Sequence, residues 1–100
     1  HAISYLKLEK GYRCSWHRHA AKYNLFVVLH GRVGIVTEEL DGVKREAILT
    51  KGQTHTTRPG QWHEFRVYED SEMLEDMFVE YDESDIERVS KGSKIEAVAP

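Results

Sequence analysis

Several features are scarce in this sequence, and each absence excludes a class of protein. The single cysteine, Cys14, cannot form an internal disulfide, which favours a reducing compartment and a cytoplasmic protein. No apolar run approaches the roughly 18 residues that a membrane helix needs, and no signal peptide is visible, although the chain starts at His1 rather than Met. No Lys/Arg cluster stands out and the net charge is −3, so neither nucleic acid nor a membrane is an expected partner.

Linkers, repeats and low-complexity stretches are also missing, so the chain of 100 residues predicts one domain over 1–100. Within it, short β-branched or aromatic runs are interrupted by turn signals, among them His30-Gly31-Arg32 and Glu69-Asp70, which predicts an all-β fold. The expected strands are 3–9, 15–19, 23–30, 33–38, 43–50, 53–58, 62–68 and 72–81. So many short antiparallel strands must close into a barrel or stack as two sheets. A short helix is expected at 82–89, within a C-terminal tail of 82–100.

Two histidine patterns stand out against this background. The first reads Trp16-His17-Arg18-His19, and the second ends in Gln61-Trp62-His63 after a Pro-Gly turn. Histidines two residues apart on a strand point to the same face, and another strand can bring His63 opposite them. Three imidazole nitrogens suit iron, zinc, copper or nickel. The same alternation turns Trp16 and Trp62 away from the metal, where packing is the expected role.

The spacing around these histidines resembles two motifs of the cupin family. The first motif is matched at its outer glycines and its His-x-His, but an asparagine stands where the family usually has glutamate; its residues here are Gly11, His17, His19, Asn24 and Gly31. The second motif is matched at its glycines and histidine, with the proline displaced by one position and the final asparagine replaced; its residues are Gly52, Arg58, Pro59, Gly60, His63 and Val67. The resemblance covers about 3–81.

This resemblance implies a jelly-roll β-barrel that holds one divalent metal ion (Fe, Zn, Mn or Ni) in one mouth. His17, His19 and His63 are the implied ligands, and Asn24, a neutral and weaker donor, takes the place of the fourth. The layout is also weakly similar to that of mannose-6-phosphate-isomerase-like cupins, partly through the ending at 81–88. Cupins commonly pair through an edge strand or a sheet face, so a homodimer is expected, with 3–9 as a plausible edge strand.

Candidate acid–base groups are fewer. Glu75 would point into the cavity near the metal if the odd-numbered face of 72–81 lines the barrel, and a carboxylate there would have a raised pKa. Tyr23, beside the Asn24 position, is a second catalytic candidate at the cavity rim. We expect His55 and His30 to have structural rather than ligand roles.

Three functions remain open on the sequence alone. One is a metal-dependent isomerase or epimerase of a sugar or sugar phosphate. Another is a non-haem iron dioxygenase, since three-histidine sites without a carboxylate resemble the thiol and diketone dioxygenases of the superfamily. A third is a non-catalytic cupin that binds a small molecule such as an acid or a sugar. In each case the expected partner is a small-molecule ligand.

Overall fold

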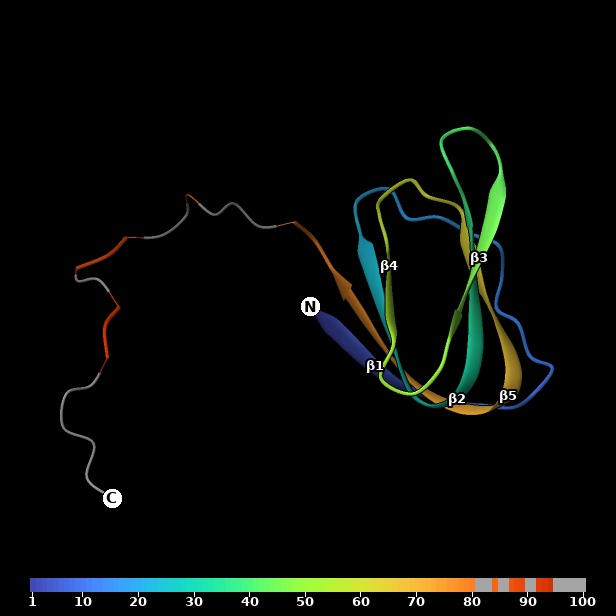
Figure 1. Cartoon of the computed structure of the whole chain (residues 1–100). Coiled ribbons are helices and arrows are strands. Elements are labelled where there is room, and N and C mark those ends of the chain that lie inside the picture. Colours follow the sequence, from blue (N-terminus) through green and yellow to red (C-terminus); the bar gives the residue numbers. More distant parts are fainter. Residues whose placement is uncertain (81–83, 85–86, 90–91, 95–100) are drawn as a thin grey trace, which may run out of the picture.

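The computed structural model describes residues 1–80, 84, 87–89 and 92–94, and this part of the chain is all-β, as predicted (Figure 1). Its strands are antiparallel: β1 (Ala2–Leu8), β2 (Tyr23–Glu38), β3 (Lys44–Leu49), β4 (Thr54–Thr57) and β5 (His63–Phe78). Four of the eight positions of the helix predicted at 82–89 lie outside the described residues, and the other four, 84 and 87–89, are not helical. No helix in the described part is long and apolar enough to cross a membrane.

The long strands β2 and β5 pair with each other and bend together, so that the one sheet of five strands folds into two layers (Figure 1). On one side of the bend, 23–28 of β2 and 71–78 of β5 are flanked by β4 and β1. On the other side, 33–38 of β2 and 63–67 of β5 are flanked by β3 and by the segment 11–17, which hydrogen bonds to β5. We call the first layer the facing wall and the second the histidine wall. Together they form the jelly-roll barrel.

The bend corrects one prediction. The turn signal at 30–32 does not divide two strands, because pairing with β5 continues past it with register shifts between Val28 and Val33. Gly31 makes the bend possible: its φ is 96°, and a Cβ atom there would lie 2.6 Å from the carbonyl oxygen of Asp70. The turn predicted at 69–70 is likewise internal to β5. The local sequence pattern indicates a change of chain direction at Gly31. It does not show that β5 continues to hydrogen bond with β2 past that point.

The strand predicted at 15–19 is also wrong. The segment 15–19 forms one isolated bridge to β5, from His17 to His63, and a second bridge, from Arg13 to Arg66, lies before it. After His17 the chain leaves the histidine wall in order to reach the start of β2, so a regular ladder cannot continue there.

The core lies between the two walls. The buried hydrophobic residues of this core come from both walls: Phe26, Val28, Val33, Ile35, Leu49, Phe65, Val67 and Met73. Burying each of the larger side chains stabilises the fold by about 1.5–3 kcal/mol. Alternation along β2 and β5 fixes which side chains share this interior with the core, because residues two apart lie on the same face.

Candidate metal centre

Two Trp-His pairs form the base of the site. His17 and His63 are directly opposed: the N–H of His17 donates to the carbonyl of His63 over 3.0 Å, and the reverse bond is 2.8 Å. Both imidazoles therefore project to the same side of the sheet, with ring centroids 4.5 Å apart. The tryptophans before them project to the other side and stack, with centroids 6.4 Å apart and planes 10° from parallel. The expected orientation of Trp16 and Trp62 is thus observed.

Backbone carbonyls fix the tautomer of both rings. Nδ1 of His17 lies 2.7 Å from the carbonyl oxygen of Ser15, and Nδ1 of His63 lies 2.8 Å from that of Gln61. A carbonyl only accepts, so each Nδ1 carries the proton and each Nε2 keeps a free lone pair. A histidine that binds a metal through one ring nitrogen usually donates a hydrogen bond from the other, as Nδ1 does here.

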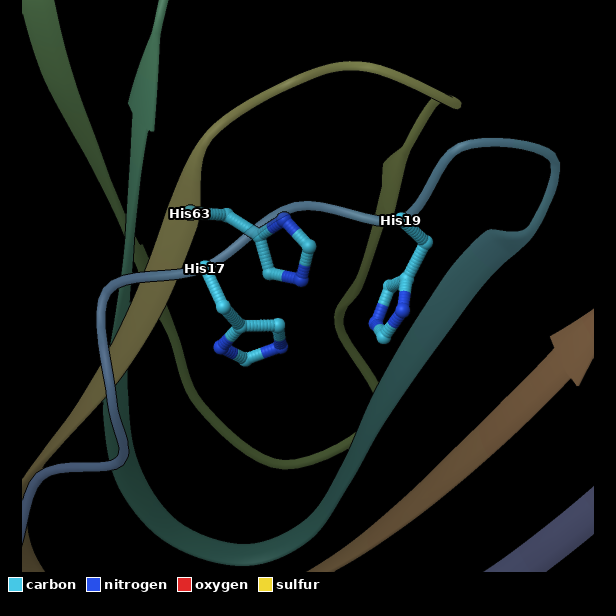
Figure 2. A group of neighbouring side chains, drawn as sticks. All are labelled: His17, His19 and His63. Atoms are coloured by element: carbon cyan, nitrogen blue, oxygen red, sulfur yellow. The ribbon is translucent and has the colours of Figure 1, made fainter.

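His19 completes the group from the segment that crosses toward β2 (Figure 2). Its carbonyl accepts a 2.7 Å hydrogen bond from the N–H of Gly60, which ties this segment to the loop after β4. Its ring meets that of His17 edge-on, with centroids 5.0 Å apart. The loop geometry, rather than strand alternation, brings the second histidine of the His-x-His pattern into the group.

The donor set fits a metal ion. Ligand nitrogens of His17, His19 and His63 all lie within 4.8 Å of one another. Nitrogens bound to one tetrahedral zinc ion are about 3.4 Å apart, so small side-chain rotations would close the group on an ion. The Nε2 atoms of His19 and His63 are buried, and neither has a hydrogen-bond partner among the described residues. Buried polar atoms are rarely left in this state, and a metal ion would satisfy them.

The protonation state of the site is also suitable. Burial lowers the pKa of His63, and the nearby charges of His17, His19 and His55 lower it further, against the hydrogen bond to Gln61. Burial likewise lowers the pKa of His19, with help from His17 and Lys22. Both rings are therefore neutral at pH 7, which is the form that binds a metal.

The facing wall presents polar groups to the same interior. Asn24 is 1% exposed and shares the inner face of β2 with Phe26, whose ring contacts His63 at 6.2 Å between centroids. Glu75 lies opposite Phe26 in the β2–β5 register, on the same face of β5 as the core residue Met73. The odd-numbered face of β5 is thus the inner one. Burial raises the pKa of Glu75, and His17 opposes that rise electrostatically.

His55 also lies on this inner face, opposite Phe26 on the β4 side. Burial lowers its pKa, and it interacts electrostatically with His63. From sequence, a structural role was expected for His55, with a position facing the cavity as the alternative. The β2–β4 register, which no local pattern reveals, is what brings it toward the cavity.

Tyr23 is not brought into the cavity. It alternates with Asn24 along β2, and its ring stacks on that of Phe78 with centroids 5.3 Å apart. Phe78 is opposite Tyr23 in the register, and the ring of His1 also stacks on that of Phe78, with centroids 5.3 Å apart. The stack lies on the outer face of the facing wall, away from the histidines.

The fold and the site together describe a small jelly-roll barrel with three imidazoles that converge at one mouth. The family model described as a cupin domain matches residues 4–75. The chain belongs to the cupin family, as its motifs indicate. No curated protein sequence matches it.

Solved structures agree on the fold. A conserved protein of unknown function from Streptococcus pyogenes superposes with a TM-score of 0.66 at 21% identity, covering 80% of this chain and 64% of that one. The sugar 3,4-ketoisomerase QdtA from Thermoanaerobacterium thermosaccharolyticum, in complex with TDP, gives 0.67 at 20% identity, covering 84% and 63%. Oxalate decarboxylase from Bacillus subtilis, studied for its Mn(II) centres, gives 0.69 at 16%, covering 83% and 22%. The chain thus spans less than two thirds of each of these three proteins, and the likeness shows the fold alone.

Proposed function

We propose that this cupin is a metal-dependent isomerase or epimerase of a sugar or sugar phosphate. The observation that carries the proposal is the placement of Glu75 on the inner face of the facing wall, where burial raises its pKa and His17 interacts with it. A carboxyl group whose pKa is raised in this way can take up and return a proton. A sugar 3,4-ketoisomerase is among the solved structures that share this fold, so the fold is compatible with such a reaction.

Each residue has a distinct task in this reaction. His17, His19 and His63 would hold a divalent ion (Fe, Zn, Mn or Ni), with Asn24 directed at the ion or its ligand. The ion, when bound, supplies a Lewis acid for a carbonyl or hydroxyl oxygen of the substrate. In the isomerase reaction the Glu75 carboxylate takes a proton from the hydroxyl-bearing carbon beside that carbonyl and returns it to the carbonyl carbon, while the hydroxyl proton passes to the former carbonyl oxygen. The substrate is rearranged with no net change in its oxidation state.

Proton exchange with solvent tests this assignment. Protein loaded with Zn or Mn is incubated in D₂O with mannose 6-phosphate, and incorporation of deuterium is followed by NMR. We expect exchange in the wild type and a loss of about 100-fold or more in Glu75→Gln, with metal content unchanged in both. Exchange that persists in Glu75→Gln would contradict the role of Glu75. Stoichiometric metal without exchange in the wild type would instead leave a binding module.

A second candidate function is a three-histidine Fe(II) dioxygenase. The observation in its favour is that the ligand cluster found among the described residues contains histidines and no carboxylate. It predicts iron rather than zinc in the purified protein, and oxygen uptake with thiol or diketone substrates. Full isomerase activity in an anaerobic, zinc-loaded sample would rule it out.

We also propose a cytoplasmic homodimer that pairs through β1. In the sheet order β1 is terminal, and Ile3 and Tyr5 on its outer face are 67% and 56% exposed. An edge strand with apolar side chains is a template for a second chain. Light scattering should give the mass of two chains for the wild type and of one chain for Tyr5→Lys. A wild-type monomer at micromolar concentration would contradict the dimer.

A further inference from the structure

Two polar atoms on the facing wall lack partners although both are buried. Asn24 is 1% exposed and Thr57 is fully buried. Neither Oδ1 of Asn24 nor Oγ1 of Thr57 has a hydrogen-bond partner within the described part of the chain. A buried polar group without a partner costs the protein its desolvation free energy. Two such groups side by side indicate a place where something else supplies the missing bonds.

The side chains of Asn24 and Thr57 are neighbours. Asn24 and Thr57 are directly opposed in the β2–β4 register. Side chains of directly opposed residues have Cβ atoms about 4.5–5.5 Å apart, so one small group can contact both. Thr57 ends β4, and the loop that follows is bonded through Gly60 to the carbonyl of His19. The pair therefore lies beside the histidine centre, at the same mouth of the barrel.

The chemistry of the pair selects a neutral, hydroxyl-bearing partner. Oδ1 of an asparagine accepts hydrogen bonds only, whereas a threonine hydroxyl donates one and accepts others. An anionic oxygen cannot donate to Asn24, so a phosphate or carboxylate group would leave the amide oxygen unpaired. An alcohol can donate to Asn24 while its oxygen accepts from Thr57. A single hydroxyl group thus satisfies both atoms.

We propose that Asn24 and Thr57 form a subsite for a hydroxyl group of the molecule bound at the histidine centre. This inference rests on the proposed function, which places a sugar or sugar phosphate in the cavity. In this arrangement Asn24 hydrogen bonds to the bound small molecule and does not coordinate the metal ion. It also makes Thr57 a specificity-determining residue, since a site built for a hydroxyl group discriminates strongly against an analogue that lacks it.

The first test is stability. Thr57→Val preserves the shape of the side chain and removes the unpaired hydroxyl. We expect the melting temperature of the metal-free protein to rise by about 2–5 °C, and the variant to bind as much metal as the wild type when it is reloaded. Thr56→Val, on the exposed outer face of the same strand, is the matched control and should shift it by less than about 1 °C. A fall in the melting temperature of Thr57→Val would show that the hydroxyl is already satisfied and would overturn the subsite.

The second test is discrimination between ligands. Affinities of the metal-loaded protein for mannose 6-phosphate and its 2-, 3- and 4-deoxy forms are measured by calorimetry. We expect one deoxy form to bind the wild type about 10–100-fold more weakly, and Thr57→Val to bind that form and the parent sugar equally. Thr57→Ser should restore the preference. Discrimination retained in Thr57→Val, or no binding of the parent sugar to the wild type, would overturn the proposal.

A third measurement separates this inference from the proposed function. Asn24→Leu should keep stoichiometric metal, because its oxygen serves the ligand; loss of metal would assign Asn24 to the ion and overturn the pair. Isomerase activity is not a readout in any of these tests. A protein that binds sugar with hydroxyl discrimination but exchanges no proton would retain the subsite and lose the isomerase.

Discussion

On the histidine wall, the polar side chains that face the cavity are held by the backbone. Carbonyls of Ser15 and Gln61 accept from the Nδ1 atoms of His17 and His63, and the two histidines also exchange backbone hydrogen bonds. On the facing wall, the buried Asn24 and Thr57 have polar atoms with no partner among the described residues. The rings of His17 and His63 are thus oriented by the backbone through Nδ1, whereas Oδ1 of Asn24 and Oγ1 of Thr57 have no such bond, although the same two strands run through both walls.

The two walls would contribute to binding in different ways: one orients the metal ligands, and the other offers polar groups to a bound molecule. Outer-shell hydrogen bonds preset the orientation of the metal ligands, so little reorganisation is needed when an ion binds. Unpaired groups on the opposite wall lower the stability of the free protein and are satisfied only in a complex. Departures from good local packing concentrate at functional positions in natural proteins. The following substitutions break or sharpen this contrast, in order of decreasing expected effect.

His63→Ala should have the largest effect, because His63 is both a candidate ligand and a fully packed ring at 1% exposure. We expect metal affinity to fall by more than about 100-fold, beyond the cost of losing an outer-shell partner. Stability should fall by about 2–4 kcal/mol from the cavity. Elemental analysis and chemical denaturation measure the two effects. His30→Ala, an exposed position at the bend, is the control. Equal metal content in both variants would contradict the histidine centre.

Gly31→Ala tests the bend that joins the walls. A Cβ atom at φ 96° would lie 2.6 Å from the carbonyl oxygen of Asp70 and 2.7 Å from Cα of Ser71, so the backbone must shift. We expect a loss of about 2–4 kcal/mol in denaturant titrations. Gly42→Ala also has a positive φ, 80°, but meets nothing within 4 Å, and should lose about 1–2 kcal/mol. Equal losses would mean that the close approach at Gly31 is unimportant.

Glu75→Gln tests the electrostatics of the facing wall. Because burial raises the folded-state pKa of Glu75, the folded protein binds more protons than the unfolded chain between pH 4.5 and that raised value. The contribution of Glu75 to stability therefore falls as pH rises through this window. The variant lacks this penalty, so in metal-free protein it should be more stable at pH 7 by about 1 kcal/mol, but not at pH 4. A constant difference across pH would argue against the raised pKa.

Lys44→Gln should have the smallest effect. The Lys44 ammonium lies 4.5 Å from the ring centroid of Trp16 on the outer face of the histidine wall. Loss of an exposed cation–π contact costs about 0.5–1 kcal/mol, and metal content should stay constant. Lys51→Gln, at an exposed turn, is the matched control and should change stability by less than about 0.5 kcal/mol. A change in metal content would show that the outer face supports the ligands.

Much of the architecture was predictable from sequence because the relevant signals are local. Runs of β-branched and aromatic residues placed the strands, and motif spacing indicated that His17, His19 and His63 converge. The errors share one physical cause. Gly31 has the sequence signature of a turn, yet hydrogen bonds from a distant strand carry β2 past it. The segment at 15–19 looks like a strand, yet it bridges β5 only at His17.

The facing wall was less predictable for the same reason. Alternation along β5 could not decide whether Glu75 or its neighbours faced inward, because both faces carry apolar residues. The pairing of Asn24 with Thr57, and of Phe26 with His55, depends on the register of two strands separated by the β3 hairpin. No motif or spacing encodes that register, so the unpaired groups become visible only in the assembled barrel.

The stacked tryptophans give the metal centre an optical reporter. Each indole is covalently adjacent to one of the opposed histidines, and the pair is nearly parallel at 6.4 Å between ring centroids. The guanidinium group of Arg18 lies over the Trp62 ring, 4.8 Å from its centroid. A shift of the two histidines toward a shared ion would be transmitted through one backbone link to each indole. Near-ultraviolet circular dichroism and intrinsic fluorescence can therefore follow occupancy of the cavity in real time, without any label and from the side opposite to the ligand.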